Sequence, residues 1–220
     1  EKVGTDNNGL QPGEINVVID PVAYVNTIVN TTVSEGGADR EDDESYRERI
    51  HEAPESFSVA GPTGAYEYFT KSASHLVVDV GVSSPQPGYV NIYPLLAGGA
   101  IPGEELLKTI TNYLSDRKRR PLTDKLTVLA PTTTQYNIDA KYYTDTGADA
   151  TAVKAKVDAA VDKYVVWQKS KIGRDIIPSR LVQMVMEVPG VKRVDVTAPV
   201  FTPIAEQSGV AVANTVSVVL

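Results

Sequence analysis

Cysteine is absent from this chain of 220 residues, and histidine and tryptophan are scarce, with two copies and one copy. Without cysteine the chain forms neither disulfides nor thiolate metal sites. His51 and His75 are too few and too far apart in sequence to predict a zinc site. The sequence also lacks the G-x-S-x-G elbow of serine hydrolases and the GKS or GKT ending of a phosphate-binding loop. We therefore predict no catalytic residues, no metal and no cofactor.

Long apolar runs and an excess of basic residues are also missing. No segment is apolar enough to span a bilayer, and the first residues do not form a signal peptide, so we expect no membrane anchor. The net charge is −7, which argues against nucleic acid as a partner because phosphate binding needs clustered Lys and Arg. Paired carboxylates for sugar hydrolysis stay open, because their separation in space decides that chemistry. Nothing in the sequence selects such a pair.

Acidic residues gather in the stretch "GGADREDDESYRERI", residues 36–50. A calcium loop needs a central Gly and a bidentate Glu at its twelfth position, and here the two glycines come before the acids. A helix start explains the pattern better, with Asp42 or Asp43 as the N-cap and further acids at the positive end of the helix dipole. We also expect an ion pair between Asp43 and Arg47, and an apolar face shared by Tyr46 and Ile50.

Hydrophobic periodicity predicts an α+β fold, with small, mostly antiparallel sheets that carry helices on one face, in two subdomains. Residues 1–35 are rich in Val, Ile and Thr and are interpreted as the end of a truncated β domain. Residues 36–130 form the middle α+β subdomain and residues 131–220 the C-terminal one. Helices are expected over 43–53, from an N-cap at Thr63, over 103–116, over 149–168 and from Pro178. A hairpin is expected over 75–96, where Leu76, Val78, Val80 and Val82 alternate. Further strands are expected over 125–131, over 135–144, after Pro189 and at the end of the chain.

A basic run follows the predicted helix at 103–116, namely Arg117, Lys118, Arg119 and Arg120. Cations at a helix C-terminus complement the dipole, and Pro121 ends the helix. Four cations exceed what a dipole needs, so an acid-binding patch remains an alternative. Trp167 is expected to serve packing and not a ligand platform.

Several long motifs together resemble the baseplate J-like family. They are the acidic stretch at 36–50, "SVAGPTGAYEYFTKSA" at 58–73, and the segment from "VNIYPLL" at 90–96 to the Arg-Arg-Pro-Leu-Thr-Asp run at 119–124. The resemblance covers about residues 9–200. It implies a structural wedge subunit in the baseplate of a contractile phage tail or bacteriocin-like particle, assembled in the bacterial host cytoplasm. It also implies that the chain is not an enzyme, and that its partners are other wedge proteins and neighbouring copies in a ring around a hub.

The resemblance suggests a second role for the charged segments, in which opposite charges set the register between neighbours. The candidate assembly interface consists of Arg117, Arg119 and Arg120 on one side and Asp39, Glu41 and Asp42 on the other. Arg119→Glu with Arg120→Glu is then expected to leave the domain folded and to block assembly. Two other functions stay open at this point, a carboxylate-based cell-wall hydrolase associated with a baseplate and a receptor-binding tail module.

Overall fold

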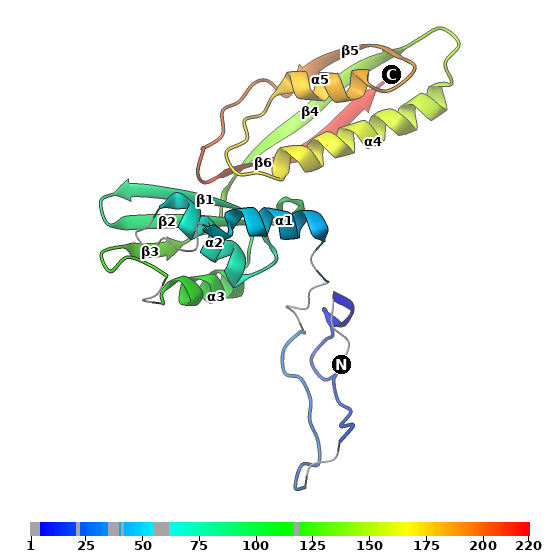
Figure 1. The fold of residues 1–220 in the computed structure, drawn as a ribbon. Coiled ribbons are helices and arrows are strands. Elements are labelled where there is room, and N and C mark those ends of the chain that lie inside the picture. The colour runs from blue at the N-terminus through cyan, green and yellow to red at the C-terminus, as the bar shows by residue number, and fades with distance from the viewer. Residues whose placement is uncertain (1–4, 21–22, 35–39, 41, 55–61, 117–118) are drawn as a thin grey trace. The chain divides into compact units, whose positions relative to one another are not determined.

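The computed structural model describes residues 5–20, 23–34, 40, 42–54, 62–116 and 119–220, and the chain divides into two units, Glu1–His51 and Glu52–Leu220 (Figure 1). Within the described residues the secondary structure confirms the α+β class, with five α-helices and two three-stranded sheets. No helix among these residues combines the length and the apolar character that a membrane span requires. The helices are α1 (Asp43–Glu52), α2 (Thr63–Ala73), α3 (Glu104–Leu114), α4 (Ala150–Lys169) and α5 (Pro178–Met186).

The first unit begins with a short 3-10 helix, η1 (Thr5–Asn7), and two extended segments. These segments run antiparallel, because Gly9 N–H donates to the Ser34 carbonyl at 2.7 Å and Ser34 N–H donates to the Leu10 carbonyl at 3.0 Å. The structure assigns no strand to the described part of residues 5–34, although β structure was predicted there. The Asn30 side chain adds to the backbone pairing of these segments, since its Oδ1 accepts from the N–H groups of Gly13 and Ile15.

The first sheet of the second unit has the order β1-β2-β3 and comprises β1 (Val77–Gln86), β2 (Tyr89–Leu96) and β3 (Lys125–Val128). β1 and β2 form the predicted antiparallel hairpin, and β3 runs parallel to β2. The parallel pair follows from topology, because α3 connects β2 to β3 and carries the chain back across the sheet. Helices α2 and α3 pack against this sheet, where Tyr66, Phe69, Ile92, Ile110 and Leu114 form the core.

Two local predictions for this region are wrong. Leu76 and Val78 are 39% and 44% exposed, while Val77 is buried, because a bulge between Val77 and Asp79 shifts the alternation by one residue. Thr63 is the first residue of α2, and the N-cap is Pro62 without a side-chain hydrogen bond. Proline fixes φ near the value that this entry turn requires, so the helix begins without a hydroxyl cap.

The second sheet has the order β5-β4-β6, with β4 (Thr132–Thr144), β5 (Val191–Ala198) and β6 (Gly209–Val219). β4 pairs antiparallel with β5 and parallel with β6, so this sheet is also mixed and not mostly antiparallel. The predicted alternation along β4 is confirmed, since its inward side chains are at most 7% exposed. They meet the buried faces of α4 and α5, and the resulting core includes Tyr136, Ile138, Tyr142, Val157, Val161, Tyr164, Leu181 and Val185.

A third hydrophobic cluster joins the two sheets of the second unit. Leu95 of β2 packs with Ile172, which follows α4, and with Val210 of β6. The Asp79 carboxylate of β1 accepts a hydrogen bond from the Ile172 N–H at 2.8 Å. A Cβ placed on Gly81 would lie 2.0 Å from the Gln207 carbonyl oxygen, so only glycine fits this close approach. The predicted division of the chain at residue 130 falls between the two sheets, and it remains a prediction.

Candidate assembly surface

The described part of the acidic stretch forms the start of α1. The Asp42 carboxylate accepts a hydrogen bond from the Glu44 N–H at 2.9 Å, as an N-cap residue does. Arg47 pairs with Glu44 and not with Asp43, which places the ion pair at i,i+3. Asp39 and Glu41 lie outside the described residues. Within the described part of the chain no three His, Asp or Glu side chains are arranged to hold a metal ion.

Arg119 lies beside the end of α3 and contacts groups of its own chain. Its guanidinium stacks 3.8 Å from the centre of the Tyr113 ring and donates to the Tyr113 carbonyl at 3.0 Å. It also forms an ion pair with Asp116 at 3.2 Å, and 29% of its side chain is exposed. Arg117 and Lys118 lie outside the described residues. Arg119 therefore stabilises the C-terminal end of α3.

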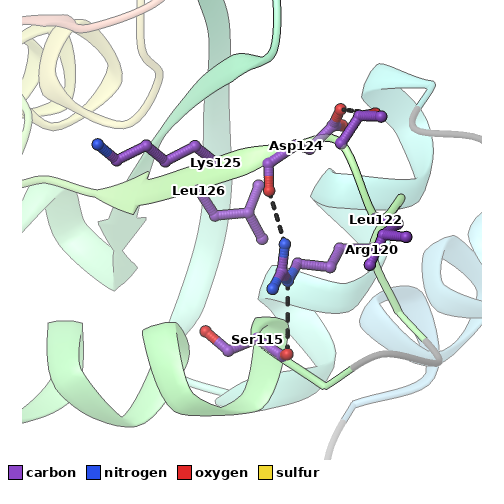
Figure 2. Close-up of a pocket in the computed structure, with 7 residues that line it drawn as sticks. Ser115, Arg120, Leu122, Asp124, Lys125 and Leu126 are labelled. Atoms are coloured by element: carbon purple, nitrogen blue, oxygen red, sulfur yellow. Dashed lines mark hydrogen bonds between the residues drawn. The ribbon is translucent and has the colours of Figure 1, made fainter.

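Arg120 connects α3 to the loop that follows it (Figure 2). Its Nη1 donates to the Asp124 carbonyl at 2.7 Å, and its Nε makes a long contact with the Ser115 carbonyl at 3.5 Å. A shallow pocket of about 350 Å³ lies beside this bridge. Leu122 lines the pocket and is 88% exposed, which leaves an apolar side chain open to a partner. The polar lining belongs to Ser115, Arg120, Thr123, Asp124 and Lys125.

Asp124 ties the same loop to α2. The Tyr66 hydroxyl donates to the Asp124 carboxylate at 2.5 Å, and the Thr123 hydroxyl donates to the other carboxylate oxygen at 3.2 Å. Burial raises the pKa of Tyr66, and the hydrogen bond to Asp124 raises it further. The Arg-Arg-Pro-Leu-Thr-Asp run is thus a local clamp between two helices. The run was recognised in the sequence, but its hydrogen bond to α2 was not predicted, because Tyr66 lies 58 residues away from Asp124.

Trp167 packs against the core of the second sheet, as predicted. Its ring lies 6.0 Å from that of Tyr164, and the Arg174 guanidinium stacks 4.2 Å from its centre. Burial lowers the pKa of Arg174, while the Asp79 carboxylate acts in the opposite direction. These contacts serve packing.

Comparison with known protein families adds decisive information. A family model described as "Baseplate J-like central domain" matches residues 58–130, and one described as "Baseplate J-like protein C-terminal domain" matches residues 136–219. Together the two models match more than half of the chain. The chain belongs to the baseplate J-like family.

One similar protein supports the same assignment, and one solved structure has a similar fold. "Baseplate protein J" of Escherichia phage P2 is 34% identical over 171 residues, which cover 77% of this chain and 56% of that protein. A chain in the cryo-EM structure of the anti-feeding prophage baseplate, 6-fold symmetrised, has a similar fold, with a TM-score of 0.56 at 16% identity. The match covers 93% of this chain and 49% of that chain. The present chain therefore spans about half the length of the relatives it matches.

Proposed function

We propose that this chain is part of a structural wedge subunit in the baseplate of a contractile tail or injection machine. The observation that carries the proposal is the succession of the two baseplate J-like domains in one chain, with 34% identity to the phage P2 protein. The similar fold in the anti-feeding prophage baseplate supports it. The subunit acts by protein–protein contacts and carries out no chemistry of its own.

The packing within residues 52–220 suits a part that transmits force. Leu95, Ile172 and Val210 are buried in the contact between the two sheets, and Gly81 approaches the Gln207 carbonyl too closely for any side chain. Close-packed interiors deform little under load. A subunit whose contacts with neighbouring subunits rearrange when a sheath contracts benefits from this stiffness.

The partners we propose are other baseplate proteins and neighbouring copies of the chain in a ring around a central hub. The 6-fold symmetrised baseplate that contains a similar fold supports a ring. Complementary surfaces on neighbouring subunits are what a head-to-tail ring requires. The proposed location is the tail baseplate of the particle, assembled in the host cytoplasm.

The charged interface remains part of the proposal in a modified form. Asp39, Glu41 and Asp42 of one subunit supply the negative side. On the positive side Arg119 and Arg120 bind Tyr113 and Asp124 of their own chain, so a neighbour competes with these internal contacts. Arg117 lies outside the described residues, and its part in this interface is tested separately.

The proposal is tested with the full-length protein in its host. A tagged copy should co-purify with contractile particles and localise to the baseplate end by electron microscopy, and deletion of the gene should leave particles without a baseplate. Particles that are complete without the protein contradict the proposal. Cell-wall clearing by the purified protein on a zymogram would favour the hydrolase instead.

The interface is tested separately by two double substitutions that change the net charge by the same amount. Arg117→Glu with Lys118→Glu should leave the melting temperature unchanged and block assembly. Arg119→Glu with Arg120→Glu should lower the free energy of unfolding by about 2 kcal/mol, because charged hydrogen bonds to backbone carbonyls are lost. Normal assembly of the first variant removes the basic run from the interface.

A further inference from the structure

A second basic surface lies between α4 and α5, which Figure 1 shows on the same side of the second sheet. The two helices enclose a groove of about 400 Å³, called here the α4–α5 groove. Lys156 and Lys163 of α4 and Arg180 of α5 line it with positive charge. Ala160, Met184 and Val188 supply apolar lining. The groove thus offers cations beside an apolar surface.

The groove is positively charged, although the net charge of the whole chain is −7. Lys156 and Lys163 are seven residues apart, which places their side chains on one face of α4, about 10 Å from each other along the axis. Among the described lining residues Glu187 is the acidic one, and its carboxylate already accepts a hydrogen bond from the Gln183 amide at 3.1 Å. An acidic partner therefore meets a net positive lining.

Arg180 provides a specific reason for a carboxylate in this groove. Its Nη1 donates to the Gln183 side chain at 2.7 Å, and its guanidinium lies 5.5 Å from the centre of the Trp167 ring. Its Nε is buried and has no hydrogen-bond partner among the described residues. The guanidinium as a whole lines the groove, and a carboxylate is the acceptor that a guanidinium binds best.

We propose that the α4–α5 groove receives the acidic first turn of α1 from a neighbouring copy of this chain. On a helix Asp43, Tyr46 and Ile50 fall on one face, so this turn presents a carboxylate next to two apolar side chains. Tyr46 and Ile50 are 49% and 53% exposed. The carboxylate of Asp43 meets the cations of the groove, with Glu44 adding negative charge beside it, and the apolar side chains meet Met184 and Val188.

This inference rests on the proposed function, because it names the contact by which neighbouring subunits join. It gives the acidic stretch a second basic surface to bind, besides the run at 117–120. Arg119 and Arg120 are bound within their own chain, whereas Lys156 and Lys163 of the groove form no ion pair among the described residues. Charge complementarity of this kind fixes which surfaces meet and makes binding sensitive to salt.

The test uses the full chain and a synthetic peptide of residues 38–52. Trp167 is the one tryptophan of the sequence and lies beside Arg180, so its fluorescence reports on the groove. We expect saturable binding of the peptide that weakens with added salt.

Lys156→Glu with Lys163→Glu should lower the affinity for the peptide at least tenfold. If this charge reversal unfolds the chain, the neutral pair Lys156→Gln with Lys163→Gln is used in its place. Lys171→Glu with Lys192→Glu makes the same charge change at exposed positions outside the groove and should bind like the wild type.

A charge exchange makes the test specific. A peptide with Asp43→Lys and Glu44→Lys should fail to bind the wild-type chain and should bind the Lys156→Glu, Lys163→Glu variant. Equal binding of the peptide by all variants, or none by the wild type, overturns the inference. Particle assembly distinguishes failure of the groove contact from failure of the proposed baseplate role. If the groove variants assemble normally, the inference fails and the baseplate role stands, whereas absence of the wild-type protein from particles removes the role itself.

Discussion

Two buried tyrosine hydroxyl groups have opposite surroundings. The Tyr66 hydroxyl donates to the Asp124 carboxylate at 2.5 Å, whereas the Tyr136 hydroxyl is buried without a hydrogen-bond partner among the described residues. The rings themselves are both in hydrophobic cores. The same substitution at the two positions therefore separates the hydrogen bond from the packing of the ring.

Tyr66→Phe should lower the free energy of unfolding by about 1.5 to 3 kcal/mol, because it leaves the Asp124 carboxylate without its hydroxyl donor. Tyr136→Phe should change it by less than about 0.5 kcal/mol or stabilise the chain, since it removes an unpaired polar group. Urea unfolding of both variants gives the comparison. Equal losses would mean that the clamp between Tyr66 and Asp124 adds nothing to stability.

Stability should also fall in alkaline solution. Burial raises the pKa of Tyr164 to about 12 and raises the pKa values of Tyr66 and Tyr136 as well. The unfolded chain loses these protons near pH 10, while the folded chain keeps them. The contribution is therefore complete below pH 10 and falls by about 1.4 kcal/mol per pH unit for each tyrosine as the pH rises toward the folded pKa.

Urea unfolding between pH 9 and 11.5 measures this slope. Tyr164→Phe should reduce the slope by about 1.4 kcal/mol per pH unit. Tyr24→Phe is the control, because Tyr24 is fully exposed. If the slope of unfolding free energy against pH were unchanged in the Tyr164 variant, the raised pKa of Tyr164 in the folded chain would be contradicted.

The elements of the second unit differ in how well the sequence predicts them. The alternation along β4 and the apolar stripe of α4 depend on regular periods of two and 3.6 residues, and both were predicted correctly. The bulge at Val77 breaks the period of β1, and pairing with Leu96 and Leu95 of β2 sets its position. The parallel partner of β4 is likewise a contact between distant segments. Such contacts leave no periodic signal in the sequence.

Gly81 tests how closely the two sheets of the second unit fit. Gly81→Ala should lower the free energy of unfolding by about 3 kcal/mol or more, because its Cβ would lie 2.0 Å from the Gln207 carbonyl oxygen. Gly103→Ala is the matched control, since nothing lies within 4 Å of the added Cβ. Gly103 is the N-cap residue of α3, so that change should cost about 1 kcal/mol or less. Similar values for the two variants in urea would show that the sheets adjust easily.

The start of α1 is predicted to be a helix cap and not a metal site. The Asp42 carboxylate accepts from the Glu44 N–H, and Glu44 pairs with Arg47, so these acids already have partners within the helix. Micromolar calcium, magnesium or zinc should leave the melting temperature of the chain unchanged relative to a sample in EDTA. A tightly bound ion would raise it by mass action, and a rise of several degrees would refute the interpretation.

At the scale of the whole chain, the sequence predicted the family and the charged segments but not the contacts those charges make. The Arg119 side chain bends back onto Tyr113, and Arg120 reaches Asp124 across a loop. Both contacts join residues that are close in sequence, but they depend on the path of the chain after α3, which no periodic pattern encodes. The α4–α5 groove was also missed, because its cations come from two helices and no motif links Lys156 to Arg180.

Limited proteolysis tests the organisation of the chain. The structure divides it at His51 and Glu52, while the composition changes at Gly36 and Gly37. We expect the first cuts between residues 34 and 42, or in the exposed turn at 145–147 between β4 and α4. The fragment that begins near residue 43 should keep the melting temperature of the whole chain, because the hydrophobic cores lie within residues 65–211. Early cuts within 104–114 or 153–165 would contradict this, since both segments are helical and pack on their sheets.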